Sequence, residues 1–342
     1  MNPPQGDASA GHTPDPDTTR PRAAAGDSER IDAESAGDRT ARYWGRHDLT
    51  RTVLDALTAA GKDLDHLSVD DLAATDQFHG GGRPATLRLA QLADLAGRAD
   101  MADLAGRADM AELAGPAEMT GESGPNEPGE AGPEPGGGRR VLDVGGGLGG
   151  PARVLAERFG CLVTVIDLTP SYVATAQVLT DLVGLADRVT HQVGDALDLP
   201  FADESFDLVW TQNSGMNIAY KERLYQGFYR VLRAGGTLAF QEPMAGAVSP
   251  PHFPLMWAAK ADLSFLWAPS EVRALLASIG FEEQTWELVS EAASSAAAPN
   301  PPPHAVQRII MGDEHLAAIA KATRRNLDED RITTVHGVFT KR

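Results

Sequence analysis

Val-Leu-Asp-Val-Gly-Gly-Gly-Leu-Gly-Gly, residues 141–150, is the most informative stretch of this 342-residue chain. Its first four residues are apolar apart from Asp143, which is typical of a short buried strand. The glycines that follow allow a sharp turn and a close approach of the backbone to a ligand. A helix expected from Gly150-Pro151 onward would direct its unpaired N–H groups to the same place. The stretch therefore predicts a strand, a ligand-binding loop and a helix.

Strands and helices alternate on the C-terminal side of this loop. Further strands are expected at 162–166, 189–193, 206–210, 237–240, 281–289 and 332–339. Helices are expected at 150–160, 169–184, 224–232 and 270–280, the last with Ser270 as its N-cap. This alternation predicts an α/β fold with a doubly wound, mostly parallel sheet. Ligands of such sheets bind outside the carboxyl ends of the strands.

Two low-complexity segments divide the chain. Residues 1–40 are rich in Pro, Gly, Ala and Asp, and we expect a disordered tail. Residues 94–138 repeat a nine-residue unit and then become Gly/Pro/Glu-rich; they are interpreted as an expanded loop, with a recognition helix as the alternative. We expect a helical cap over 41–93 and the core over 139–342, with a substrate-facing insertion at about 244–269.

The charge of the chain comes mostly from these two segments. The chain has 30 basic and 48 acidic residues, a formal charge of −18, and the two segments hold 18 of the acids but only 6 of the basic residues. This balance disfavours nucleic-acid and anionic-membrane partners. A lone cysteine, Cys161, and scattered histidines indicate no disulfide framework and no metal site. With no long apolar run and no secretory pattern, we expect a soluble, cytoplasmic protein.

Three acidic residues stand where consecutive strands are expected to end. Asp143 precedes the glycines, Asp167 ends the second strand and Asp195 ends the third. A carboxylate in the place of Asp167 can accept both hydroxyls of a ribose. The glycines also satisfy G-x-G-x-x-G, so an NAD(P)-dependent oxidoreductase is one alternative. However, Asp143 would repel a pyrophosphate and suits an ammonium or sulfonium charge.

Asp143-x-Gly145-x-Gly147-x-Gly149, together with Asp167 and Asp195, resembles the glycine-rich motif and acids of class I S-adenosylmethionine-dependent methyltransferases. The resemblance is close over 139–243 and looser beyond. It is strongest to the small-molecule branch that includes glycine/sarcosine and quinone or natural-product methylating enzymes. Two further segments, 76–81 and 210–218, are similar to the cap and to the loop beside the methyl group in that family.

The resemblance implies a Rossmann-like sheet of seven strands with an antiparallel last strand and an N-terminal helical cap. It implies S-adenosyl-L-methionine as cofactor, held by Asp143, Gly145, Gly147, Gly149, Asp167, Leu168, Asp195, Ala196 and Gln212. A small-molecule acceptor would be methylated on N, O or C by in-line displacement. It would be contacted by Asn213, Met216 and Trp257. This chain has Asn213 where many relatives have histidine, so no base is assigned there.

Two histidines are candidates for a general base, His79 in a Gly-rich loop and His252 in the insertion. Each has a plain alternative, a loop histidine that hydrogen-bonds the backbone. Lys221-Glu222-Arg223 is predicted to be a solvated helix face. Besides the oxidoreductase, which would lack a Tyr-x-x-x-Lys pair, the remaining alternative is a non-catalytic protein that retains the cofactor fold. The sequence leaves the oligomeric state open.

Overall fold

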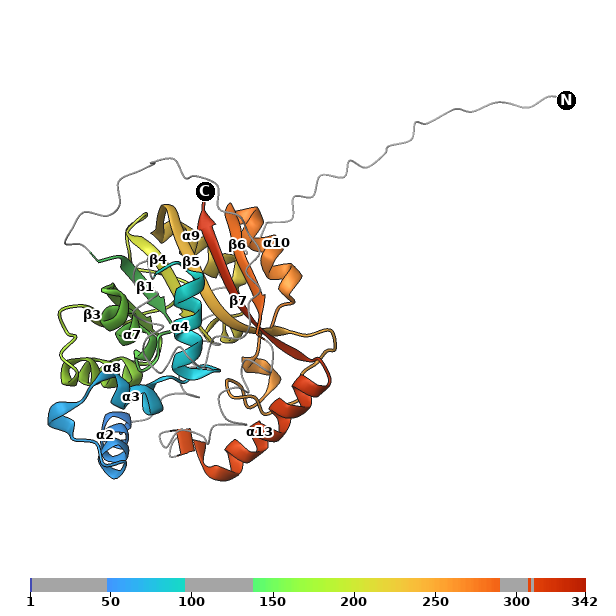
Figure 1. Cartoon of the computed structure of the whole chain (residues 1–342). Coiled ribbons are helices and arrows are strands. Elements are labelled where there is room, and N and C mark those ends of the chain that lie inside the picture. The colour runs from blue at the N-terminus through green and yellow to red at the C-terminus, as the bar shows by residue number, and fades with distance from the viewer. Residues whose placement is uncertain (2–47, 96–137, 290–306, 309–310) are drawn as a thin grey trace, which may run out of the picture.

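The protein is described by a computed structural model that covers Met1 and residues 48–95, 138–289, 307–308 and 311–342 (Figure 1). The expected disordered tail, apart from Met1, lies outside the described residues. So does the expected loop between residues 96 and 137, which includes nearly all of the nine-residue repeat.

The core is a seven-stranded sheet in the order β3-β2-β1-β4-β5-β7-β6. Its strands are β1 (Arg140–Val144), β2 (Leu162–Asp167), β3 (Val189–Val193), β4 (Phe206–Gln212), β5 (Leu232–Ala245), β6 (Phe281–Leu288) and β7 (Ile332–Lys341). The five strands from β3 to β5 pair in parallel, and β7 pairs antiparallel with both β5 and β6. The predicted fold class, a mostly parallel sheet with an antiparallel last strand, is confirmed.

Helices cover both faces of the sheet. On one face α4 (Gly82–Leu92) and α7 (Gly150–Phe159) share an apolar core with β1, β2 and β4. On the other face α9 (Lys221–Val231) and α10 (Pro269–Ile279) share a core with β4, β5 and β7. The helix α8 (Pro170–Leu182) packs on β2 and β3. The carboxyl ends of β1 to β4 remain at the open edge between these two layers.

Within residues 48–95, three helices precede the sheet, in the segment where the sequence predicts a helical cap. They are α2 (Leu49–Ala59), α3 (Val69–Asp76) and α4, with a 3₁₀ turn, η1 (Leu64–His66), after α2. A capping box begins α3, because Ser68 Oγ accepts from the Asp71 N–H and the Asp71 carboxylate accepts from the Ser68 N–H. The helix α2 contacts α8 and α3 contacts α7, so these helices lie on the side of the sheet where the glycine-rich loop lies (Figure 1).

Three local expectations differ from the structure. The strand expected at 237–240 is the middle of β5, which begins at Leu232 because a bulge absorbs the Gly235-Gly236 pair. Ala268 rather than Ser270 is the N-cap of α10, and its N–H donates to the Glu271 carboxylate at 2.8 Å. The helix α13 (Asp313–Asp328) was not predicted. In the described ranges, every helix is too short or too polar to cross a bilayer.

Candidate active site

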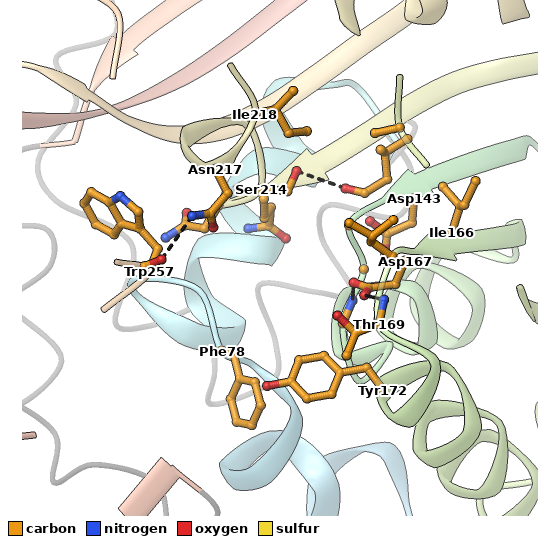
Figure 2. A pocket seen from close by; sticks show the side chains of 18 of the residues that line it. Phe78, Asp143, Ile166, Asp167, Thr169, Tyr172, Ser214, Asn217, Ile218 and Trp257 are labelled. Atoms are coloured by element: carbon orange, nitrogen blue, oxygen red, sulfur yellow. Dashed lines mark hydrogen bonds between the residues drawn. The ribbon is translucent and has the colours of Figure 1, made fainter. Parts of the chain in front are cut away.

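The carboxyl ends of the first four strands open onto one pocket with a volume of about 190 Å³ (Figure 2). Its walls come from the glycine-rich loop, the ends of β2 and β3, the turn after β4, the loop between α3 and α4, and residues 256–257. The cap and the insertion thus reach the same place as the sheet edge. This is the position that the sheet topology predicts for a ligand.

The glycine-rich loop takes a conformation that side chains resist. Gly145, Gly147 and Gly149 have φ values of +71°, +55° and +78°, in the region that favours glycine. The Gly145 N–H donates to the Ile166 carbonyl at 2.7 Å, which ties the loop to β2. Gly145 and Gly147 line the pocket, but Gly149 does not. Gly149 is the N-cap of α7, where a Cβ would lie 2.6 Å from His191 Cε1, so the structure gives it a conformational role.

Asp143 provides a buried acceptor at the floor of the pocket. Its side chain is almost fully buried, and Oδ2 has no hydrogen-bond partner. Burial, followed by the charge of Asp167, raises the pKa of Asp143 to about 7. An unpartnered buried carboxylate is costly, and a positively charged group bound beside it would remove that cost. The site therefore fits a ligand with an ammonium or sulfonium group.

Asp167 and Asp195 stand at the ends of the next two strands. The Asp167 carboxylate accepts from the N–H groups of Gly147, at 2.9 Å, and Thr169, at 2.8 Å, while burial raises its pKa. Asp195 is exposed at the rim and accepts from the Leu197 N–H at 2.8 Å. The expected neighbours Leu168 and Ala196 also line the pocket. The three strand-end acids are therefore brought together as the sequence predicts.

Gln212 lines the pocket, but its side-chain amide is held by protein groups. Its Oε1 accepts from Trp210 Nε1 and from Thr86 Oγ1, both at 3.1 Å. Its Nε2 donates to Gln241 Oε1 at 3.0 Å. Both the oxygen and the nitrogen of this amide therefore hydrogen-bond to protein groups, which fixes this part of the pocket wall.

His79 also lines the pocket and is buried. Its Nε2 lies 2.9 Å from Gln77 Oε1 and 3.0 Å from Thr86 Oγ1. Its Nδ1 lies 3.3 Å from the Gly80 carbonyl and 3.4 Å from Gln212 Nε2. The ring is thus fixed in orientation at the edge of the pocket, on the side of the cap.

The other candidate base, His252, is not part of the pocket wall. Its Nε2 lies 2.9 Å from the Glu329 carboxylate, and its backbone exchanges hydrogen bonds with the Asn326 side chain. Both partners lie at the C-terminal end of α13, the helix that the sequence did not predict. His252 therefore joins the insertion to α13, and the geometry does not support the expected catalytic role.

The turn after β4 supplies another part of the pocket wall. Asn213 has a φ of +54°, and its N–H donates to the Gln241 carbonyl at 2.8 Å. The Asn213 side-chain Oδ1 is buried and has no hydrogen-bond partner. Met216 follows in a 3₁₀ turn, η2 (Gly215–Asn217), and is also buried in the wall.

Trp257 is fixed against this turn. Its carbonyl accepts from Asn217 Nδ2 at 3.0 Å, and its indole N–H donates to Ser264 Oγ at 3.1 Å. A second bond, from Asn217 Nδ2 to the Leu263 carbonyl at 2.7 Å, ties the insertion to η2 again. Figure 2 shows Trp257 and Asn217 across the pocket from Asp143.

Two buried charges beneath η2 were missed by sequence reasoning. The Glu242 carboxylate accepts from the Ser214 N–H at 3.1 Å and the Gly215 N–H at 2.8 Å. Lys221 Nζ donates to the carbonyls of Gly215, at 2.6 Å, and Ile218, at 2.5 Å. Burial raises the pKa of Glu242 to about 6 and lowers that of Lys221 to about 8. The prediction that Lys221 lies on a solvated helix face is wrong, because its side chain reaches under the turn.

A buried ion pair on the opposite side was also missed. Arg153 Nη2 donates to Asp76 Oδ2 at 2.7 Å and to the Leu148 carbonyl at 2.6 Å. Its Nη1 donates to Thr180 Oγ1 at 3.0 Å, and that hydroxyl also contacts His191 Nε2. Arg153 thus connects the cap, the glycine-rich loop and α8. The two partners are 77 residues apart, so no local pattern could have paired them.

Comparison with known proteins finds a match for the segment that contains the glycine-rich loop and the strand-end acids. A family model described as a methyltransferase domain matches residues 142–240. The sarcosine/dimethylglycine N-methyltransferase of Halorhodospira halochloris is 34% identical over 148 residues, 43% of this chain and 53% of that protein. The chloroplastic tocopherol O-methyltransferase of Arabidopsis thaliana is 40% identical over 100 residues, 29% of each chain. The chain thus spans about half the length, or less, of these curated relatives.

Solved structures with a similar arrangement are also found. The crystal structure of the [4+2]-cyclase SpnF has a TM-score of 0.47 and 25% identity, and covers 60% of this chain and 76% of that one. A geranyl diphosphate methyltransferase in complex with SAM has a TM-score of 0.49 and 19% identity, and covers 61% of this chain and 80% of that one. The family model and the curated relatives confirm the resemblance that the motifs indicated. Residues 142–240 are thus similar to the methyltransferase domain.

Proposed function

We propose that this protein transfers a methyl group from S-adenosyl-L-methionine to a small-molecule acceptor, on nitrogen, oxygen or carbon. The observation that carries the proposal is Asp143, a buried carboxylate with an unpartnered oxygen at the base of a glycine-rich loop. A carboxylate in this place favours a cationic ligand and opposes the pyrophosphate of a dinucleotide. The methyltransferase domain match over residues 142–240 supports the same ligand.

The residues proposed to hold the cofactor are Asp143, Gly145, Gly147, Asp167, Leu168, Asp195 and Ala196, all of which line the pocket. When bound, the cofactor would supply a methyl group on a sulfonium, and the neutral thioether released on transfer is a good leaving group. Gln212 is proposed to shape the pocket wall through its hydrogen bonds. Gly149 is proposed to set the conformation of the α7 N-terminus. Each assignment is a proposal about contact and can be tested by substitution.

Catalysis in this proposal comes mainly from orientation and from exclusion of water. The wall formed by Asn213, Met216 and Trp257 would hold the acceptor, because η2 and the insertion are tied together by Asn217. His79 is the proposed base for an acceptor that must lose a proton, since it is the histidine in the pocket wall and its ring is fixed.

Titration with S-adenosylhomocysteine and with NAD⁺, followed by calorimetry, tests the cofactor assignment. We expect S-adenosylhomocysteine to bind, and Asp143→Asn to weaken that binding by about tenfold or more, since a charged partner is lost from a buried site. Asp203→Asn is the matched control, because Asp203 is exposed and pairs with Arg230 away from the pocket. Binding of NAD⁺ without binding of S-adenosylhomocysteine would overturn the proposal.

Activity is tested with cofactor carrying a labelled methyl group and an extract of small metabolites. We expect label to appear in an organic-extractable product, and to depend on intact protein. Tight cofactor binding without transfer to any component of such extracts would favour the non-catalytic alternative. The two experiments therefore separate the three functions that the sequence left open.

A further inference from the structure

A second, smaller cavity lies behind the turn η2 when the turn is viewed from the main pocket. Its volume is about 10 Å³, which is close to the space that one water molecule needs. Met216 lines both the main pocket and this cavity, so η2 is a wall that the two spaces share. The contents of the small cavity therefore bear on the position of η2 and of the pocket wall that it carries.

Three polar side chains that the proposed function does not use meet at this cavity. Glu242 comes from β5, and Lys221 and Tyr225 come from α9; each is 3–4% exposed. The other walls are mostly apolar and come from Pro243, Met244, Phe265, Trp267 and Val272. A purely apolar cavity stays dry, whereas a buried water needs about two to four polar partners. The three polar side chains can supply them.

Glu242 and Lys221 each have hydrogen-bonding capacity that η2 does not use. The Glu242 Oε1 accepts from the Ser214 and Gly215 N–H groups, whereas Oε2 is buried and has no partner among the described residues. Lys221 Nζ donates to the Gly215 and Ile218 carbonyls, which leaves the third N–H of the ammonium for another acceptor. A buried carboxylate oxygen without a partner is costly, so a donor in the cavity would stabilise the folded protein.

Tyr225 supplies a hydroxyl from a ring that aromatic packing holds in place. Its ring centroid lies 5.8 Å from that of Phe228, with the two planes nearly perpendicular, and 6.4 Å from that of Phe240. Burial, followed by the charge of Glu242, raises the pKa of Tyr225, so the hydroxyl keeps its proton. Buried tyrosine hydroxyls usually find a hydrogen-bond partner, and this one is available as a donor at the cavity.

We propose that one ordered water molecule occupies this cavity and hydrogen-bonds to all three side chains. The water donates to Glu242 Oε2 and accepts from the Tyr225 hydroxyl and from the third N–H of Lys221. It thereby joins the two buried charges that hold the N–H and the C=O groups of η2. Tyr225 and Glu242 are positioning residues, because they act on the acceptor through Met216 in the shared wall. This role of the water rests on the proposed function, whereas its presence does not.

A crystal structure of the protein with S-adenosylhomocysteine, at a resolution that shows ordered solvent, tests the presence of the water. We expect one solvent peak within hydrogen-bond distance of Glu242 Oε2, the Tyr225 hydroxyl and Lys221 Nζ. A direct hydrogen bond from Tyr225 or Lys221 to Glu242 Oε2, with no solvent peak between them, overturns the inference. So does a cavity without density.

The effect of the network on η2 is tested by NMR of protein with ¹³C-labelled methionine methyl groups. The signal of Met216 is assigned with Met216→Leu. We expect Tyr225→Phe to shift this signal, because the ring stays and only the hydroxyl that binds the water is lost. Tyr229→Phe is the matched control, since Tyr229 lies on the same helix and its hydroxyl donates to the Arg342 carbonyl instead. A Met216 signal that Tyr225→Phe leaves unchanged overturns the positioning role.

Methyl transfer from labelled cofactor to the metabolite extract tests the consequence for the acceptor. We expect Tyr225→Phe to lower the rate by about threefold to tenfold, the effect of one lost buried hydrogen bond, with unchanged affinity for S-adenosylhomocysteine. Glu242→Leu should lower the rate further, and Glu242→Gln should recover it, because the amide still accepts from η2 and can donate to the water. Equal rates for Tyr225→Phe and Tyr229→Phe overturn the positioning role, as does an equal loss of rate and of cofactor affinity.

The proposed function and this inference fail in different ways. If S-adenosylhomocysteine does not bind the wild-type protein, the proposed function is wrong, and a crystal structure of the protein alone still decides whether the water is present. If S-adenosylhomocysteine binds and methyl transfer occurs but the cavity holds no water, the proposed function stands and only this inference is wrong.

Discussion

The pocket has a glycine-loop end, formed by the loop after Asp143, and a proposed acceptor end, formed by Asn213, Met216 and Trp257. Different kinds of buried charge hold these two ends in place. At the glycine-loop end, Arg153 makes a direct ion pair with Asp76 and also donates to the backbone of the loop. At the acceptor end, Lys221 donates to backbone carbonyls and Glu242 accepts from backbone N–H groups of the same turn. The glycine-loop end is held by an ion pair between side chains of separate elements. At the acceptor end, backbone N–H and C=O groups of one turn hydrogen-bond to the two charged side chains.

This difference indicates which change each end tolerates. Removal of one member of a direct buried pair leaves the other charge unpaired. Removal of one charge beneath the turn leaves the other charge hydrogen-bonded to backbone groups, and only neutral carbonyls or N–H groups lose a partner, which costs less. The glycine-loop end should therefore be the more sensitive to loss of a single side chain.

Arg153→Met gives the largest expected effect. The substitution removes the buried guanidinium that donates to the Asp76 carboxylate, so we expect a loss of about 3–5 kcal/mol in the free energy of unfolding. Urea denaturation measures it, and Arg273→Met is the control, because the exposed pair with Glu283 is worth about 1 kcal/mol or less. Asp76→Asn in the Arg153→Met background should recover part of the loss. A cost equal to that of the control would remove the distinction between the two ends.

Asp143 makes the stability of the glycine-loop end depend on pH. Its pKa is raised from 3.8 to about 7 in the folded protein, so between these values the folded state keeps a proton that the unfolded chain has released. The resulting stability is fully present below about pH 4 and is lost as the pH rises through 7. The wild type should lose on the order of 4 kcal/mol of unfolding free energy across this window, and Asp143→Asn should not show this loss.

The measurement is thermal or urea unfolding of the ligand-free protein at a series of pH values. The difference between the wild type and Asp143→Asn isolates this carboxyl from other titrating groups. Saturating S-adenosylhomocysteine should reduce the difference, because a cationic amino group beside Asp143 would favour its charged form. Parallel pH profiles of the two proteins would show that Asp143 is not the group with the raised pKa.

Lys221→Met is expected to have an intermediate effect at the acceptor end. The carbonyls of Gly215 and Ile218 lose their donor, and we expect a loss of about 2 kcal/mol in unfolding free energy. Glu242→Gln should cost about 1 kcal/mol or less, since the amide oxygen still accepts from the Ser214 and Gly215 N–H groups. A larger loss for Glu242→Gln than for Lys221→Met would contradict the idea that backbone dipoles solvate this pair.

The glycine-loop end could be predicted from the sequence because it is built from consecutive strand–loop–helix units. Parallel strands bring their carboxyl ends to one edge, so Asp143, Asp167 and Asp195 must meet once the alternation is known. The acceptor end could not be predicted to the same depth. It is assembled from the cap, the turn after β4 and the insertion, and their meeting depends on tertiary packing.

Individual errors have the same origin. Lys221 lies in a run of three charged residues, which locally indicates exposure, but the first turn of α9 is covered by η2. The bulge that lengthens β5 depends on its pairing with β4, so the sequence pattern of β5 alone does not predict it. His252 follows the fifth strand, which predicts a place near the acceptor, but it is not among the residues that line the pocket and its Nε2 lies 2.9 Å from the Glu329 carboxylate.

His252→Gln is expected to have the smallest effect and tests the boundary of the acceptor end. His252 is partly exposed and pairs with Glu329, so we expect a loss of about 1 kcal/mol or less in unfolding free energy. Binding of S-adenosylhomocysteine and the rate of methyl transfer should be unchanged, because His252 lies outside the pocket wall. His79→Gln is the contrasting variant, since it removes the proposed base from a pocket-lining position held by Gln77 and should lower the rate of methyl transfer. If His252→Gln lowered methyl transfer and His79→Gln did not, the acceptor would lie between the insertion and α13, and the wall around Asn213 and Trp257 would not be the acceptor site.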